Sequence, residues 1–97
     1  MTKGYWVAQV DVHDPGAYAA YRQANAVAFA KYGARFLVRG GAGVVREGAA
    51  RSRVVVIEFA SLATAMACYD SPEYQAAKAL RTPVSDADLV IVEGWDG

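Results

Sequence analysis

Segments rich in β-forming residues alternate with helix-forming segments along the whole chain, and this alternation limits the folds that the chain can adopt. We expect strands over four segments: 4–12, 34–39, 52–59 and 88–94. We expect helices over three segments: 15–31, 62–69 and 72–81. The order β-α-β-β-α-β, with an extra helix before the last strand, predicts a single α+β domain over residues 1–97. Its simplest form is a ferredoxin-like two-layer sandwich, with an antiparallel sheet and the helices on one side.

Two of the predicted helices begin with the same local signal, a polar capping residue followed by proline. Asp14 precedes Pro15, and Ser71 precedes Pro72. The capping oxygen accepts hydrogen bonds from free backbone N–H groups, and proline fits the first helical position because it has no N–H to satisfy. Large side chains at spacings of three or four mark the buried face of the first helix: Tyr18, Tyr21, Asn25, Phe29 and Tyr32.

Alternation along the four predicted strands separates their side chains into two faces. The apolar set, which we assign to the side under the helices, is Trp6, Ala8, Val10, Val12, Phe36, Val38, Val55, Ile57, Phe59, Val90 and Val92. The mixed set is Tyr5, Val7, Gln9, Asp11, Arg35, Leu37, Arg39, Val54, Val56, Glu58, Leu89, Ile91 and Glu93. Helices on one side leave the apolar members of the mixed set uncovered, and such a surface usually marks an interface. We therefore expect a homodimer whose two sheets face each other and form a barrel.

The charge balance excludes several classes of partner. The chain has ten basic and ten acidic side chains, whereas nucleic acid and anionic membranes attract proteins with a clear basic excess. No apolar run approaches the roughly 20 residues that span a bilayer. The first ten residues lack the pattern of a signal peptide, and the single Cys68 cannot form an internal disulfide. These features predict a cytoplasmic protein that binds neither nucleic acid nor membrane.

Arg39 and Glu58 are the charged pair that the expected hairpin brings together on the mixed face. If the chain folds back near residues 49–50, Glu58 lies opposite about Gly41, and Arg39 is one diagonal step away. Gly40 and Gly41 are expected to form a bulge or bend. Two interpretations remain open: a structural ion pair in the barrel wall, or a pair that binds an anion and transfers protons.

Short motifs throughout the chain resemble a bacterial family catalogued as domain of unknown function 1330. They include Gly4-Tyr5-Trp6, Arg39-Gly40-Gly41, and Tyr69-x-Ser71-x-x-Tyr74. The resemblance implies the dimeric α/β-barrel superfamily, in which ferredoxin-like subunits pair sheet to sheet. Its members include cofactor-free monooxygenases, muconolactone isomerases, haem-dependent enzymes and stress-response proteins of unclear activity, so the fold leaves the chemistry open.

Several polar and aromatic residues have both a structural and a functional interpretation. Asn25 interrupts an otherwise aromatic helix face, where it either satisfies neighbouring polar groups or orients a ligand. The hydroxyls of Tyr21 and Tyr69 either serve the core or form a polar-tipped aromatic pocket. Trp6 is expected in the core or in the wall of such a pocket. Ser71 is expected to cap its helix, although a ligand carboxylate could occupy the same N-terminus.

The remaining reactive residues predict no metal and no cofactor. His13 is the only histidine, so it cannot form a multi-histidine metal site, although Asp11 shares its strand face. Haem-binding members of the superfamily use a histidine later in the domain, and none is present there. Cys68 is expected to be a small buried apolar residue, and Arg81 is expected to face solvent at a helix end.

Two functional hypotheses follow. In the first, a small organic acid or phenol-like molecule binds in a cleft beside the barrel, between the mixed face and the helix after Ser71. Arg39 would hold an oxygen of this molecule and Glu58 would accept a proton, in proton transfer or cofactor-free oxidation. The side chains expected to bind the substrate are Trp6, Tyr21, Asn25, Tyr69 and Ser71. In the second, the protein is a non-enzymatic dimeric module, metabolite-binding or stress-related, whose charged residues are structural and whose barrel interior has no cavity fit for a ligand.

Overall fold

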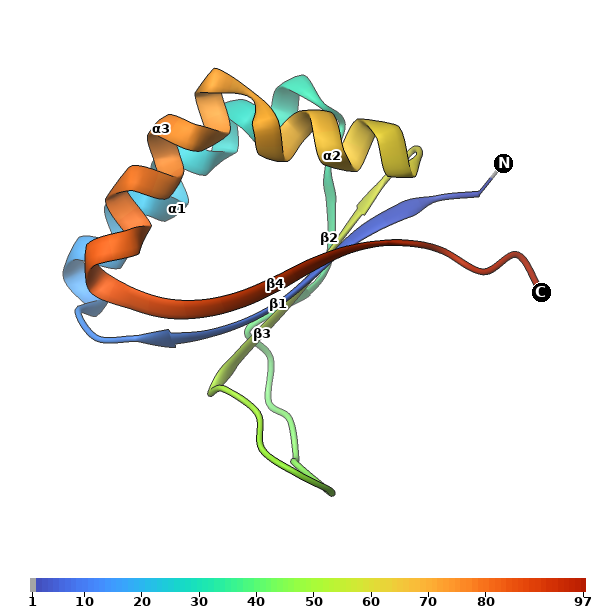
Figure 1. Ribbon diagram of the computed structural model, residues 1–97. Coiled ribbons are helices and arrows are strands. Elements are labelled where there is room, and N and C mark those ends of the chain that lie inside the picture. The colour runs from blue at the N-terminus through green and yellow to red at the C-terminus, as the bar shows by residue number, and fades with distance from the viewer. Residues whose placement is uncertain (1) are drawn as a thin grey trace.

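The computed structural model describes residues 2–97 as a four-stranded antiparallel sheet whose helices all lie on one face (Figure 1). The elements are β1 (Gly4–Val12), α1 (Pro15–Lys31), β2 (Arg35–Arg39), β3 (Arg53–Phe59), α2 (Leu62–Asp70), α3 (Pro72–Arg81) and β4 (Ser85–Glu93). A 3₁₀ turn at Thr82–Val84 joins α3 to β4, and the strand order is β2-β3-β1-β4. This confirms the expected ferredoxin-like α+β fold. No helix within residues 2–97 combines the length and apolarity required to cross a lipid bilayer.

The capping signals in the sequence locate the helix starts correctly. The Asp14 side chain accepts a hydrogen bond from the Ala17 backbone N–H at 3.1 Å. The Ser71 hydroxyl accepts one from the Tyr74 N–H, also at 3.1 Å. Each side chain satisfies a donor that the first helical turn leaves free, so local chemistry is enough to set these boundaries.

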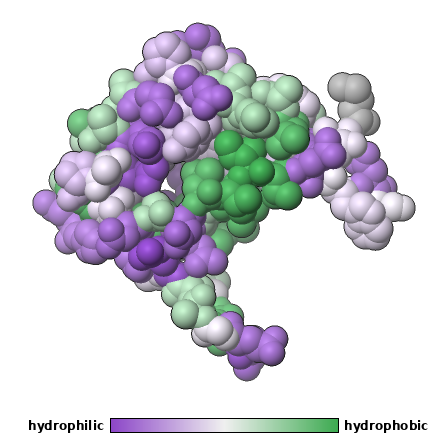
Figure 2. Space-filling view, viewed as in Figure 1, coloured by the Kyte–Doolittle hydropathy of each residue, from purple (hydrophilic) through white to green (hydrophobic). Residues whose placement is uncertain are grey.

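A largely aromatic core joins the helices to the sheet. Trp6 of β1 is at its centre, 1% exposed, and its indole N–H donates to the Ala65 carbonyl at 2.8 Å. The ring contacts Phe29 edge-on at 5.3 Å between centroids and Tyr74 edge-on at 4.8 Å. Figure 2 shows apolar side chains gathered between the helical layer and the sheet, beside a hollow.

The assignment of β4 to the two faces is wrong in the sequence-based prediction. Ile91 pairs with Trp6, and Leu89 pairs with Ala8, so both lie under the helices. Val90 and Val92 point to the other side and are 56% and 44% exposed. The strand begins at Ser85 rather than at residue 88, because pairing with Val12 continues directly from the 3₁₀ turn. This end of the chain is a short apolar run in which both phases are equally apolar, so alternation alone does not determine its two faces.

A bulge in β2 exchanges the faces of two further residues. The register changes between Phe36 and Val38, so Val38 pairs with Val56 and Arg39 pairs with Val55. A bulge inserts one residue into a strand and therefore reverses the direction of the side chains that follow it. Val38 consequently lies on the sheet face opposite the helices, and Arg39 turns toward the helices.

The sheet face opposite the helices, which we call the outer face, is not covered by any helix within residues 2–97 (Figure 1). The prediction of an uncovered apolar face is therefore confirmed, with a different contribution from β2 and β4. A long connection between β2 and β3 projects beyond the sheet, on the side away from the helices (Figure 1). The outer valines, as we call the apolar residues of this face, are Val7, Val38, Val54, Val56, Val90 and Val92.

Replacing Gly4 with alanine is expected to destabilise the fold by about 1–3 kcal/mol, the usual cost of overpacking. A Cβ at this position would meet the backbone carbonyl oxygen of Ser61 and, at 2.6 Å, the backbone nitrogen of Leu62. Gly41→Ala is the matched control, because nothing lies within 4 Å of the added carbon. Urea unfolding of both variants measures the difference, and equal stabilities would contradict the prediction.

Candidate functional site

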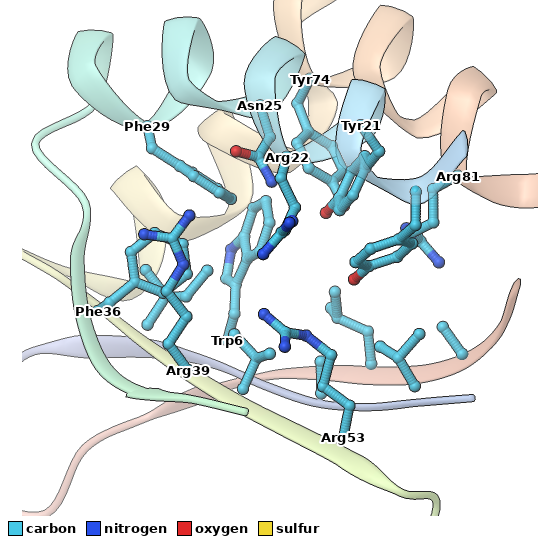
Figure 3. Close-up of a pocket in the computed structure, with 17 residues that line it drawn as sticks. Trp6, Tyr21, Arg22, Asn25, Phe29, Phe36, Arg39, Arg53, Tyr74 and Arg81 are labelled. Atoms are coloured by element: carbon cyan, nitrogen blue, oxygen red, sulfur yellow. The ribbon is translucent and has the colours of Figure 1, made fainter. Parts of the chain in front are cut away.

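A cavity lies between the helical layer and the helix-facing side of the sheet (Figure 3). About 510 Å³ of space lies within its outline, a figure that includes open solvent. Its walls come from all four strands and from α1 and α3, and their aromatic side chains are Trp6, Tyr18, Tyr21, Phe29, Phe36 and Tyr74.

Four arginine side chains line this cavity, and no carboxylate does. They come from four different elements: Arg22 from α1, Arg39 from β2, Arg53 from β3 and Arg81 from α3. Within residues 2–97, none of them forms an ion pair with an acidic side chain. The chain as a whole has no net charge, so positive charge is concentrated at this cavity and the compensating acidic side chains lie elsewhere. Such a cavity attracts anions.

The four arginines differ in their burial. Arg81 is only 8% exposed, and its guanidinium carbon lies 5.5 Å from the centre of the Tyr21 ring. Arg53 is half-buried, and its Nε is a buried atom without a hydrogen-bond partner among the described residues. Arg22 and Arg39 are exposed, where the cavity meets solvent. A buried donor without a partner is energetically costly.

The position of Arg53 depends on a glycine at the end of β2. Gly40 has φ of +70°, and its backbone N–H donates to the Val54 carbonyl at 2.8 Å. A Cβ on Gly40 would overlap the Arg53 guanidinium group. Glycine therefore serves two purposes here: it adopts the left-handed conformation, and it leaves room for the arginine against the backbone.

Hydrogen-bonding groups accompany the arginines. Asn25 is 5% exposed, lines the cavity, and makes no side-chain hydrogen bond to another residue within 2–97. Figure 3 shows its amide directed into the cavity. The hydroxyls of Tyr21 and Tyr74 are 2.9 Å apart and hydrogen-bond to each other. Burial raises the pKa of Tyr74 and the pKa of Tyr18, so both hydroxyls stay protonated and remain able to donate.

The expected pairing of Arg39 with Glu58 is wrong. Glu58 is opposite Arg35 in the β2–β3 register, not opposite Gly41, and its carboxylate lies 4.0 Å from the Arg35 guanidinium. It also accepts a hydrogen bond from the Tyr5 hydroxyl at 3.2 Å, on the outer face. Arg39, in contrast, lies on the helix side of the sheet. The two groups expected to act together are therefore on opposite faces.

The register differs because β2 and β3 are not joined by a tight hairpin. Ser52 donates its backbone N–H to Asp11 at 2.9 Å, and Arg51 donates its own to Gln9 at 3.0 Å. The Arg51 guanidinium bridges Asp11 at 3.0 Å and Asp88 at 2.9 Å. Residues 51–52 are thereby bound to the side chains of β1 and β4. They cannot pair with β2, which leaves an open loop before β3.

The structure brings together four of the seven residues expected to form the site: Trp6, Tyr21, Asn25 and Arg39. Ser71 and Tyr69 do not line this cavity. The Ser71 hydroxyl donates to the Cys68 carbonyl at 2.7 Å and caps α3, so both of its roles are structural. The Tyr69 ring packs edge-on against Trp6 at 5.7 Å between centroids.

Three arginines of the cavity were not identified from the sequence, although each carries a signal. Arg53 continues the alternation of Val55 and Ile57 back by one step on the helix side. Arg22 follows Tyr18 by four residues and precedes Asn25 by three, so it adjoins the same helix face. Arg81 follows Tyr74 by seven residues, two helical turns, and is buried rather than facing solvent as expected.

The other reactive residues lie outside the cavity. His13 is exposed, and its Nε2 lies 2.8 Å from the Asp86 carboxylate instead of sharing a site with Asp11. Residues 2–97 contain no group of three or more His, Cys, Asp or Glu side chains placed to hold a metal ion. Cys68 is fully buried and free.

Cys68 is expected to react slowly with thiol reagents in the native protein. Burial raises the pKa of its thiol to about 12, so the reactive thiolate is scarce at pH 8. Reaction with a chromogenic disulfide reagent should be at least roughly a hundredfold slower in buffer than in 6 M guanidinium chloride, since burial also blocks access. Rapid labelling of the folded chain would contradict this placement.

Fold and site together define a class: a ferredoxin-like α+β protein with an arginine-lined aromatic cavity under its helices. The sequence model of the family described as domain of unknown function (DUF1330) matches residues 3–95, and the chain belongs to this family. The resemblance noted from the sequence motifs is thus confirmed. No curated protein matched the chain.

Solved structures with similar folds include an uncharacterised protein, RPA0582 from Rhodopseudomonas palustris. It is 19% identical, with a TM-score of 0.76, over 99% of this chain and 85% of that one. SnoaB, described as a cofactor-independent oxygenase from Streptomyces nogalater, is 13% identical, with a TM-score of 0.64. The match covers 100% of this chain and 97% of SnoaB. A protein of unknown function from Thermobifida fusca, described as dimeric and ferredoxin-like, is 19% identical, with a TM-score of 0.60. The match covers 95% of this chain and 89% of that protein. At these identities the similarity establishes the fold.

Proposed function

We propose that the protein binds a small organic anion with a flat apolar body in the cavity beneath its helices. The observation that carries this proposal is the convergence of four arginines without an acidic partner, in a chain with no net charge. Guanidinium groups bind carboxylates and enolates through paired, charge-assisted hydrogen bonds. The aromatic walls would cover the apolar part of the same molecule.

The arrangement has an electrostatic cost that a bound anion would remove. Like charges in a partly desolvated cavity repel one another, and a buried guanidinium nitrogen without a partner loses hydration without compensation. An anion relieves both. Asn25 and the tyrosine hydroxyls supply uncharged hydrogen bonds that would orient the ligand.

The cavity favours binding over proton abstraction by the protein. The lining residues include no carboxylate and no histidine, since Glu58 lies on the outer face and His13 is at the surface. A substrate that needs a base on the protein would find none among them. A molecule that enters already ionised, such as a carboxylate or an acidic phenol, suits the site.

Cofactor-free oxidation is a second candidate, favoured by one specific feature. Clustered guanidinium groups stabilise an enolate or phenolate oxyanion, which is the electron-rich form that reacts with dioxygen. The fold shared with SnoaB is compatible with this chemistry. Oxygen consumption with ionised phenols would distinguish an oxygenase from a non-enzymatic module that only binds its ligand. The presence of a cavity favours a ligand-binding form of that module over a purely structural one.

We also propose that two chains pair through their outer faces. The outer valines form an apolar surface without cover, and two proteins of similar fold are described as dimeric. Apolar surface of this kind gains stability when another protein covers it.

Calorimetric titration tests the proposed ligand class. Benzoate and 2-naphthoate are expected to bind, and their uncharged amides at least roughly tenfold more weakly, because the amides cannot neutralise the arginines. Binding of the carboxylates should weaken as salt increases. Arg46→Met, which removes a charge from the exposed loop, should change nothing. Equal affinity for acid and amide would overturn the proposal.

A further inference from the structure

The aromatic side chains of the cavity form a continuous row from Phe36 to Tyr18. The row is wider in the middle, where Phe29 also contacts Tyr74 at 6.0 Å between centroids. The successive centroid separations are 5.4 Å from Phe36 to Phe29, 5.3 Å to Trp6, 4.8 Å to Tyr74, 6.3 Å to Tyr21 and 5.2 Å to Tyr18.

Arginines lie at both ends of this row. Arg39 covers the Phe36 ring, with its guanidinium carbon 4.3 Å from the ring centre. At the other end, Arg81 lies 5.5 Å from the centre of Tyr21, and Arg53 lies 5.9 Å from the centre of Tyr18. Figure 3 shows Arg39 and Arg81 on opposite sides of the cavity. The positive charge is therefore divided between two ends.

The two ends also differ in their exposure. At the end with Arg53 and Arg81, Arg81 is buried and Arg53 is half-buried, and this end includes the hydrogen-bonded hydroxyls of Tyr21 and Tyr74. The end with Arg39 is exposed to solvent. A ligand that reaches both ends must extend from the inner wall of the cavity to its edge.

Charge arithmetic favours a ligand with more than one negative group. A monoanion bound among the four arginines leaves a net charge of +3, since four positive charges less one is three. One carboxylate accepts the paired hydrogen bonds of one guanidinium fork, so it can occupy one end only. The repulsion that remains among the arginines would be lower for a molecule with an anionic group at each end than for a monoanion.

We infer that the ligand is a dicarboxylate whose two carboxylates are separated by a flat aromatic or unsaturated body. This inference rests on the proposed function and assigns its ligand class. The inner carboxylate binds Arg53 and Arg81, and the outer carboxylate binds Arg39. A dianion with both charges on one group, such as a phosphate monoester, would leave Arg39 without a partner.

Two matched pairs of ligands test the inference by calorimetry: benzoate with terephthalate, and 2-naphthoate with naphthalene-2,6-dicarboxylate. In at least one pair, the dicarboxylate is expected to bind roughly tenfold more tightly than the monocarboxylate, since it gains a second charge-assisted contact. Phenyl phosphate carries its charge at one end, and it should bind no more tightly than benzoate.

Arg39→Met provides the decisive comparison. It should lower the affinity for the dicarboxylate at least roughly tenfold more than the affinity for the monocarboxylate and so abolish the advantage of the dicarboxylate, while Arg46→Met retains the advantage. Arg39 is exposed, so the variant should fold, and circular dichroism checks this. The inference is overturned if neither dicarboxylate exceeds its partner, if phenyl phosphate binds as tightly as the better dicarboxylate, or if the advantage survives in Arg39→Met. If none of the carboxylates binds, the proposed function itself fails.

Discussion

Replacing Arg53 with methionine is expected to weaken the binding of organic anions at least roughly tenfold and to leave the protein at least as stable as before. The affinity falls because a charge-assisted hydrogen bond contributes about 1.5–3 kcal/mol. The stability does not fall, because the Arg53 Nε has no hydrogen-bond partner and the side chain forms no ion pair within residues 2–97. Methionine retains the unbranched apolar stem against Tyr18, so little packing is lost.

Opposite effects on affinity and stability are typical of a binding site, and they separate this role from a structural one. Calorimetric titration with 2-naphthoate and urea unfolding of the free protein measure the two quantities. Arg53→Lys keeps the charge but loses the planar fork, so its affinity should fall between those of the wild type and Arg53→Met. A loss of more than about 1 kcal/mol in the unfolding free energy of Arg53→Met would identify Arg53 as a structural residue instead.

Introducing glutamate at Val56 is expected to weaken the association of two chains at least roughly a hundredfold. Val56 is central on the outer face, where it pairs with Val7 on one side and Val38 on the other. A carboxylate buried between two sheets without a partner costs several kcal/mol. Analytical ultracentrifugation should show a dimer for the wild type at micromolar concentration and a monomer for the variant.

Two further variants make this test independent of folding defects. Val90→Glu introduces the same charge at an outer valine that is 56% exposed in the single chain, so the monomer should tolerate it. Val27→Glu changes a valine of α1 that is 61% exposed on the helical layer, and it should leave the dimer intact. A wild-type monomer at micromolar concentration, or a Val90→Glu dimer of unchanged strength, would contradict pairing through the outer face.

Much of the fold could be predicted because its signals are local. The Asp14-Pro15 and Ser71-Pro72 pairs locate two helix starts, since a cap and its backbone donors are only three residues apart. β1 and α1 have the predicted bounds. The alternation in β1 correctly identified Trp6 as buried and the outer face as uncovered, because strand periodicity depends only on neighbouring residues.

The composition of the site was decided by contacts that are distant in the sequence. A bulge at Leu37 turned Arg39 toward the helices, and β2 and β3 pair across a long loop in a register that places Glu58 opposite Arg35. Register depends on which side chains hold the loop open, and no local pattern encodes that choice. The pairing of Arg39 with Glu58 failed for this reason.

Sequence alone determined the order of the elements, the caps, and the apolar surface that a single helical layer cannot cover. Only the tertiary structure decided that Arg22, Arg39, Arg53 and Arg81, which belong to four different elements, meet in one aromatic cavity. The physical reason is the range of the information. Propensity and periodicity act over a few residues, whereas the convergence of charge depends on how helices and strands pack across the core.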